Sequence, residues 1–561
     1  MKNRLLVIAL TTTALVAPAV IAPDLAAEES NSLVNKLLDQ IVAREHRLLD
    51  TMRARTPMVE TYIQEESAPI STSQTDERPV KDHYFLGRFH IGQTVDYEPL
   101  ADHNGTPVAK ENAKSLKRNA ARNQNMSFLP RGFAQMSVID ATDFNRQTYS
   151  FDFVRREFLG EVRCLVFDVT PIVPQQPGRF VGRIWVEDRD QAIVRFNGTY
   201  VPELPGKNKI PERYFHFDSW RTNIADGEWV PSQIYVEESG ESGKNGSETP
   251  RFKAQTRIWD YAAAPTRNLE ELTSVLIESQ APVKDQSGST DVSPLESQRS
   301  WEQMAEANLV ARLEKGGLLA PAGAVDQVLD TVVNNLIVSA NLNVDAHCRV
   351  LLTTPLETFT FGRTIFISRG LIDVLPDEAS LALVLADELS HIALGHRTQT
   401  QFAFNNQTML SDVALLQRFR FQRTPEEMRE AGKKTIEIMR TSPYQKTGNA
   451  GLFLKALAAR GSSLPGLLKA NLGNQVANSD ALARLAEFAA AAPALDDDKL
   501  EQIAALPLGS RVKLSPWNNQ LVLVKTRPIA LLSSREKMPF EVTPFVPYLT
   551  RNEAVTAAKA P

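Results

Sequence analysis

Cysteine is almost absent from this sequence. Only Cys164 and Cys348 occur among 561 residues, and they lie far apart in the chain. Two distant thiols exclude a disulfide-rich scaffold and a cysteine-rich zinc module. Any metal site must therefore be built from carboxylates and from the eight histidines of the chain.

An excess of positive charge is also missing. The chain has 62 Lys and Arg residues against 67 Asp and Glu residues, which gives a formal net charge of -5. A protein that binds nucleic acid carries a basic field, so nucleic acid is not a predicted partner. The 27 glycines and 33 prolines are ordinary for a folded protein and exclude a collagen-like architecture. The length corresponds to about three or four folding units of roughly 150 residues each.

The N-terminal segment 1–27 has the order of a secretory signal. Lys2 and Arg4 precede an apolar run over residues 5–22, and small residues follow this run. We predict cleavage between residues 22 and 27, and an exported protein that is periplasmic or secreted. An uncleaved anchor helix is the alternative, because about 18 apolar residues just suffice to span a bilayer.

The rest of the chain divides by its hydrophobic pattern. Residues 30–65 carry apolar residues at helical spacing, which predicts a long helix. Between about 83 and 261, apolar and polar residues alternate in short runs separated by turn residues, which predicts an antiparallel sheet. We therefore expect five segments: a signal peptide at 1–27, a helix plus an antiparallel β domain at 28–265, a linker at 266–300, a helical domain at 301–475, and a C-terminal helix and small β segment with a tail at 476–561.

The N-terminal part resembles a known architecture. A helix followed by successive hairpins, with the strands GRIWVED and HFDSW, is similar to the half-barrel of the LolA-type lipoprotein carriers. This resemblance implies a concave sheet that binds lipid. Lipid at the N-terminal sheet is therefore one candidate partner.

The segment 375–396, LPDEASLALVLADELSHIALGH, is the sharpest candidate for a chemical site. Its apolar run predicts a buried helix, on which Asp387 and His391 are four residues apart and share a face. Glu388 lies beside them. In zinc peptidases, H-E-x-x-H uses this geometry: two histidines bind the metal, and the Glu is the general base. Here an Asp occupies the first ligand position, so the motif reads D-E-L-S-H.

With this motif, the region 301–470 resembles the HtpX-like and BepA-like zinc metallopeptidases, which are related to the CAAX prenyl proteases. The segment GRTIFISRGLI at 362–372 is similar to the edge strand of this family, where substrate backbone pairs. The resemblance implies that Ile365 and Ile367 lie at a substrate-binding edge. The segment REAGKKTIEIMRTSPY at 429–444 is similar to the family's downstream E-A-D helix.

The resemblance also implies a set of roles at the motif. Zinc is the implied cofactor, Glu388 the catalytic base and His391 a metal ligand. Gly395 and His396, which follow on the same helix, match the family's continuation of the motif and are expected to support the ligands.

Three departures from the family pattern fall on the metal site. Asp387 stands where the first His belongs, Met428 where a ligand Glu is expected, and Gly432 where an Asp supports a ligand. A catalytic zinc needs about three protein ligands, and a thioether is a poor zinc donor. Asp387 could join His391 as a substitute ligand, and Glu427 or Glu430 could replace Met428 if the second helix turned by part of a turn. This rescue requires two coincidences, so we expect the metal site to be degenerate.

These patterns together predict an α+β protein. An N-terminal antiparallel half-barrel-like sheet with a long helix precedes a mainly helical, zincin-like peptidase domain with a small edge sheet. We predict a pseudo-peptidase that binds proteins or peptides of the cell envelope, in assembly or quality control. Two alternatives stay open: an active zinc-dependent metalloendopeptidase with Glu388 as base, and a lipid or lipoprotein carrier that acts through the N-terminal sheet.

Overall fold

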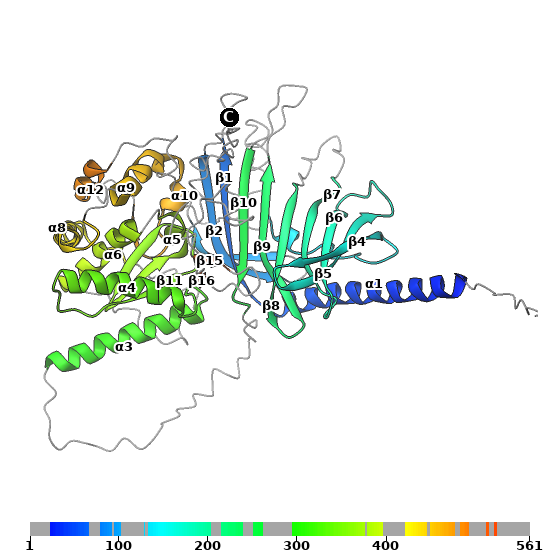
Figure 1. Cartoon of the computed structure of the whole chain (residues 1–561), viewed down its shortest axis with the longest axis horizontal. Helices are drawn as coiled ribbons and strands as arrows, with labels where there is room; N and C mark the ends of the chain where they lie inside the picture. Colours follow the sequence, from blue (N-terminus) through cyan, green and yellow to red (C-terminus); the bar gives the residue numbers. More distant parts are fainter. Residues whose placement is uncertain are drawn as a thin grey trace, which may run out of the picture.

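A ten-stranded antiparallel sheet dominates the N-terminal half of the chain in this computed structural model (Figure 1). Its strand order is β3-β2-β1-β10-β9-β8-β7-β6-β5-β4, so the sheet is open, with β3 and β4 at its two ends. The strands are β1 (Met58–Glu66), β2 (Pro79–Ile91), β3 (Val95–Asp102), β4 (Tyr149–Leu159), β5 (Val162–Pro171), β6 (Phe180–Glu187), β7 (Ile193–Tyr200), β8 (Phe217–Ala225), β9 (Glu228–Glu238) and β10 (Arg251–Trp259).

A mainly helical part with a four-stranded sheet follows, which confirms the predicted α+β class. Its elements are α3 (Pro294–Lys315), α4 (Ala324–Ser339), β11 (His347–Leu351), β12 (Glu357–Phe361), β13 (Thr364–Ser368), α5 (Arg369–Val374), α6 (Glu378–Ala393), α8 (Pro425–Thr441), α9 (Asn449–Arg460), α10 (Pro465–Leu468), β14 (Asn474–Gln475) and α12 (Ala486–Ala491). Two 3-10 turns, Ala134–Ser137 and Gly461–Ser463, and a short antiparallel pair of β15 (Val512–Leu514) and β16 (Leu521–Leu523) complete the secondary structure of the residues that the structure describes.

The structure describes residues 23–66, 79–91, 95–102, 128, 133–202, 215–238, 251–261, 294–375, 378–396, 421–445, 449–476, 483–492, 512–514 and 521–523. The apolar run of the predicted signal, residues 5–22, lies outside this part of the chain. Among the helices that the structure describes, none combines the length and the apolar character needed to cross a membrane.

Helix α1 (Pro23–Arg53) covers one face of the large sheet. Its apolar side chains at helical spacing, such as Ile41 and Met52, are buried against strand residues such as Val59 and Ile63. The sequence predicted that this helix would continue to residue 65, which is wrong. Residues 58–64 are all buried, as in a strand covered on both faces, and Pro57 separates this strand from the helix.

The face of the sheet below α1 is filled by aromatic rings. Phe180, Phe196 and Phe217 are fully buried and meet one another edge-on or tilted, with ring centroids 5.6–6.2 Å apart. Gly182 and Gly198 lie opposite each other on β6 and β7 and make room for this packing. A Cβ atom at Gly182 would lie 2.7 Å from the ring of Phe180. The chain's own side chains therefore occupy the helix-side face of the sheet.

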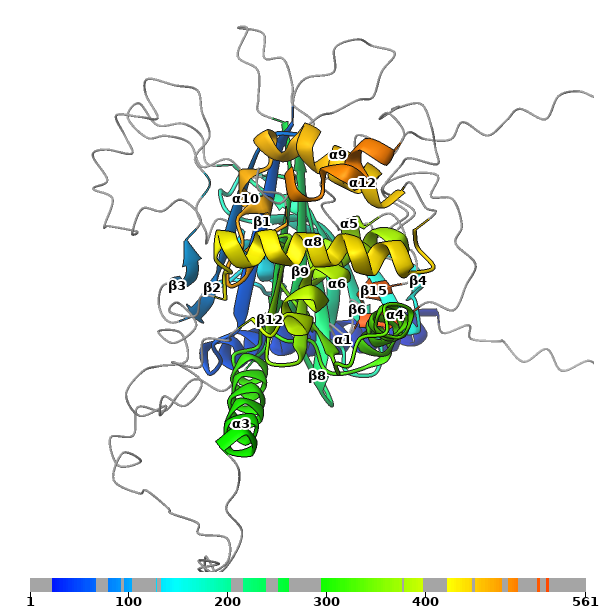
Figure 2. The same cartoon turned by 90° about the vertical axis from the view of Figure 1, so that its left-hand side faces the viewer.

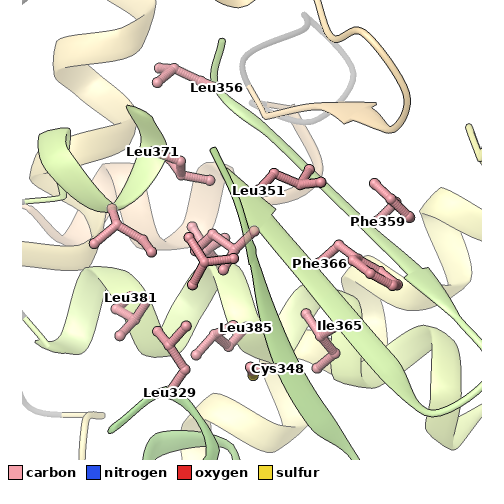
Figure 3. Close-up of a cluster of buried hydrophobic side chains, with 14 of the residues drawn as sticks. Leu329, Cys348, Leu351, Leu356, Phe359, Ile365, Phe366, Leu371, Leu381 and Leu385 are labelled. Atoms are coloured by element: carbon pink, nitrogen blue, oxygen red, sulfur yellow. The ribbon is translucent and has the colours of Figure 1, made fainter. Parts of the chain in front are cut away.

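The core of the helical part lies between its helices and the small sheet (Figure 3). Leu329 of α4 and Leu381 and Leu385 of α6 pack toward Leu351 and Ile365 of the sheet. All five side chains are almost inaccessible to solvent. This packing fixes the orientation of α6, the helix that carries the D-E-L-S-H motif.

The second face of β1 and its neighbours packs on the helical part. Met58, Tyr62 and Trp259 belong to the same buried cluster as the α4 and α6 side chains. Polar contacts cross this boundary too: the Asp82 carboxylate accepts hydrogen bonds of 2.7 Å from the backbone N–H groups of both Gly466 and Leu467. The sheet and the helical part are therefore joined by a buried, partly polar interface.

A buried carboxylate, Asp140, lies near β4 and β6 of the large sheet. Asp140 accepts hydrogen bonds from the Tyr149 hydroxyl and the Arg179 guanidinium, both at 2.6 Å, and from the backbone N–H groups of Thr142 and Asp143, both at 3.0 Å. Burial alone would raise the pKa of Asp140, but these hydrogen bonds outweigh it and hold the pKa below its ordinary value.

This depressed pKa predicts a pH-dependent contribution to stability. Asp140→Asn should lower the free energy of unfolding at pH 7 by about 1–3 kcal/mol, because hydrogen bonds to a charged acceptor are lost. The stabilisation is present above the unfolded-state pKa of about 4 and is lost as the pH falls through the lower folded-state pKa. Chemical denaturation of both proteins between pH 7 and pH 3 should show the difference shrink below about pH 4. A difference that stays constant over this range would contradict the assignment.

Candidate functional site

The D-E-L-S-H motif lies on α6 in the middle of the helical part. Figure 2 shows α8 next to α6, with α9 and α12 above them. Glu388 and His391 are each 1% exposed, and the Asp387 side chain is mostly buried. The sequence prediction that the motif sits on a buried helix is therefore confirmed, and each of the three side chains has its own surroundings.

Glu388 faces strand β12 and the segment that pairs with it. Its Oε1 atom accepts hydrogen bonds from the Thr358 hydroxyl at 2.7 Å and from the Asn474 side-chain amide at 3.4 Å. Burial, reinforced by the neighbouring Asp387 carboxylate, raises the pKa of Glu388. Its Oε2 atom has no hydrogen-bond partner among the described residues.

His391 contacts a second imidazole at the end of the same helix. The Nδ1 atoms of His391 and His396 are 2.8 Å apart, and the His396 Nε2 atom lies 3.3 Å from the Glu430 carboxylate. Gly395 has a φ of 67°, which ends the helix and turns His396 back toward His391. Burial lowers the pKa of His391 to about 3, so its ring is neutral. Its Nε2 atom has no partner in the part of the chain that the structure covers.

Asp387 forms an ion pair that sequence reasoning did not find. Both of its carboxylate oxygens accept hydrogen bonds from the guanidinium of Arg484, one of them at 2.6 Å. The Thr435 hydroxyl of α8 donates a further hydrogen bond of 3.1 Å. Arg484 lies just before α12, outside the segments that resemble the peptidase motifs, and no spacing in the sequence connects it to Asp387.

Glu427, a substitute ligand position on α8, makes its hydrogen bonds with Thr424 at the start of its own helix. It is the third residue of α8 and forms a capping box with the N-cap Thr424: its carboxylate accepts hydrogen bonds from the Thr424 backbone N–H at 3.0 Å and from the Thr424 hydroxyl at 3.2 Å. Met428 is half-buried. Within the described ranges, no three His, Cys, Asp or Glu side chains gather closely enough to hold a metal ion.

The strand that carries Ile365 and Ile367 is not an edge strand, which corrects the prediction for 362–372. Strand β13 pairs in parallel with β11 on one side and antiparallel with β12 on the other. Both isoleucines are fully buried. The order of strands depends on tertiary packing, and the alternation of residues within one strand does not reveal it. A peptide therefore has no access to the backbone of β13.

The chain also covers the outer edge of β12, beside Glu388. Asn474 of β14 pairs with Thr358 of β12. The Glu357 carboxylate, which is fully buried, accepts hydrogen bonds from the backbone N–H groups of Leu472 and Gly473 at 2.8 and 3.1 Å. A Cβ atom at Gly473 would lie 2.4 Å from the Thr358 carbonyl oxygen, so only glycine permits this close approach.

Comparison with known proteins supports the peptidase-like assignment of the second part. Residues 324–451 match the sequence model of peptidase family M48. This match confirms the predicted resemblance over the segment that contains α4, strands β11, β12 and β13 of the small sheet, α6 and α8. No curated protein matches the chain.

Solved structures that are similar to the chain include three of low sequence identity. An outer membrane lipoprotein-sorting protein domain from Vibrio parahaemolyticus is 9% identical, covers 42% of this chain and 95% of its own, and has a TM-score of 0.19. A DUF1329 family protein from Desulfovibrio piger is 11% identical, with coverages of 40% and 94% and a TM-score of 0.18. A LolA superfamily protein from Nitrosomonas europaea is 13% identical, with coverages of 41% and 93% and a TM-score of 0.17.

The described donor set does not fit the zinc ion that a family M48 match implies. Of the three positions aligned with metal ligands, only His391 offers a donor atom without a partner in the structure's described part. The two oxygens of Asp387 are held by a guanidinium, which repels a metal cation. Position 428 carries a thioether, and the nearby Glu427 caps its own helix.

Proposed function

We propose that this chain is an exported, metal-free relative of the family M48 peptidases that binds envelope proteins or peptides without cutting them. The ion pair between Asp387 and Arg484 is the observation that carries the proposal. It places a permanent positive charge against the side chain that should ligate the metal. The matched segment 324–451 supports a peptidase-like scaffold.

The surroundings of Glu388 support the same proposal. Metal-assisted peptide hydrolysis requires a water polarised by the metal and a carboxylate that accepts its proton. Thr358 and Asn474 already donate hydrogen bonds to one oxygen of Glu388. With β12 covered and β13 internal, a peptide also lacks a free strand beside this residue. A binding role would therefore use a surface other than the strand of Ile365 and Ile367.

A hydrolysis assay tests the absence of peptidase chemistry. Unfolded casein and a quenched-fluorescence peptide library should be cut at the same background rate by the wild type and by Glu388→Gln, with and without added zinc. The wild type and the variant are purified in the same way, so cleavage by a contaminating protease appears equally in both and cancels in the comparison. Cleavage that depends on zinc and falls at least 100-fold in Glu388→Gln would establish the alternative, an active zinc-dependent metalloendopeptidase.

The lipid-carrier alternative places the function in the large sheet. Phe180, Phe196 and Phe217 fill the face below α1 with the chain's own rings, so an acyl chain would have to displace them. Extraction of the purified protein with organic solvent should yield no stoichiometric lipid. One bound lipid per chain would favour the carrier role over the proposal made here.

A further inference from the structure

We propose that Arg484 is a built-in replacement for the metal ion, a fixed cation that holds α6 and α8 together at the former ligand position. This inference rests on the proposed function, because it assumes a chain without zinc. In this inference Arg484 supplies the positive charge that the metal ion supplies in the family. The same side chain accounts for Asp387 and Gly432, two positions where the sequence departs from the family pattern.

The geometry is that of a strong, largely desolvated ion pair. Two guanidinium nitrogens of Arg484 bind the two oxygens of Asp387, and the two side chains are only 9% and 14% exposed. Fork-to-fork pairing of this kind combines charge with fixed orientation. The Thr435 hydroxyl adds a hydrogen bond from α8, so the carboxylate on α6 is held from two sides. A guanidinium stays charged at every physiological pH and cannot be removed by a chelator.

The space for Arg484 comes from Gly432 on α8. A Cβ atom at position 432 would lie 3.2–3.3 Å from the Cβ, Cγ and Cδ atoms of Arg484, so the arginine stem lies directly against the glycine backbone. A carboxylate side chain at this position would occupy the same volume. Asp387 and Gly432, the two positions where the sequence departs from the expected His and Asp, are therefore both in contact with Arg484.

Arg484 reaches the site from outside the matched segment 324–451. It lies just before α12, which packs on α9, and Arg440 of α8 pairs with Glu487 of α12 at 2.6 Å. This exposed pair and the buried pair of Arg484 both tie the α12 segment to the α6–α8 unit. The cation is thus supplied by the chain itself, through a segment that follows the peptidase-like core.

A double-mutant cycle on the full chain tests the replacement. Asp387→Asn and Arg484→Met should each lower the folding equilibrium constant by roughly a hundredfold or more, because each leaves a desolvated partner without its charge. The double variant should lose at least tenfold less than the product of the two single effects. Arg429→Met removes an exposed pair with Glu426 on α8 and serves as the control, with a change below about fivefold.

A milder cycle keeps the test valid if Arg484→Met does not fold. Arg484→Lys retains the charge but cannot bind both oxygens of Asp387 as a fork. It should lower the folding constant at least fivefold in the wild type and less than twofold in the Asp387→Asn background. Independent effects in both cycles, within twofold, would overturn the inference.

The outcome separates this inference from the proposed function. Stoichiometric zinc in the wild type would sink both. A chain without zinc in which the effects of positions 387 and 484 are independent would leave the proposed function standing and remove only the role of Arg484.

Discussion

Replacing Glu45 with alanine should destabilise the protein by about 3–5 kcal/mol, because it strips a buried arginine of its counter-charge. Glu45 of α1 and Arg221 of β8 are 1% and 2% exposed, and two hydrogen bonds of 2.7 Å join them. Arg221 also donates to the Ile193 carbonyl oxygen at 3.0 Å. The pair fixes the long helix on the sheet, so its loss should appear as a lower midpoint in urea denaturation.

Two variants make the Glu45 result interpretable. Asp50→Ala removes an exposed pair with Arg53 on the same helix and should cost well under about 1 kcal/mol. The double variant Glu45→Leu with Arg221→Met replaces both charges by apolar side chains and should recover most of the loss, since no buried charge remains alone. A Glu45→Ala protein as stable as Asp50→Ala would show that the pair does not anchor α1.

Replacing Glu60 with alanine should loosen the large sheet from the peptidase-like part. Glu60 lies on β1, yet its carboxylate accepts hydrogen bonds from the Thr354 backbone N–H at 2.6 Å and the Thr354 hydroxyl at 2.8 Å. The Tyr84 hydroxyl donates at 2.8 Å, and the Arg257 guanidinium lies 3.4 Å away. All these groups are buried, so we expect a loss of at least about 3 kcal/mol.

Loss of the Glu60 carboxylate should also weaken the coupling between the large sheet and the peptidase-like part, which hydrogen exchange can measure. In Glu60→Ala, hydrogen exchange at backbone amides of 352–356 and 466–473 should accelerate together, since these segments line the boundary. Glu60→Gln preserves the shape of the side chain and should show a smaller effect. Glu98→Ala, on the exposed end of the same sheet beside His90, is the control and should leave both segments unchanged. An unchanged exchange pattern in Glu60→Ala would contradict a polar junction at this residue.

The sequence was most informative where structure depends on local pattern. The alternation between residues 83 and 261 predicted the antiparallel strands, and the apolar run before Asp387 predicted the buried helix α6. The pattern was misread at 58–66, where apolar residues continue past α1 without a break in spacing. There the residues are buried on both faces, which erases the alternation that identifies a strand.

The residues of the candidate site also fall into two groups, those that the sequence pattern could identify and those that only the fold brings together. Asp387, Glu388 and His391 were recognisable because they share one helix, where residue spacing determines geometry. Arg484, Thr358 and Asn474 come from three other elements, and only the folded chain brings them to the motif. The same reason explains the error at Ile365 and Ile367: the position of a strand within a sheet depends on which strands flank it, a property that no single segment contains.

The metal content of the purified chain tests the central claim most directly. The wild type and His391→Ala should be incubated with excess zinc, passed through a desalting column and analysed by mass spectrometry of the metal. We predict less than about 0.1 zinc per chain in both, since a catalytic zinc needs about three ligands and Arg484 holds the oxygens of Asp387. One zinc per chain in the wild type that disappears in His391→Ala would contradict the account.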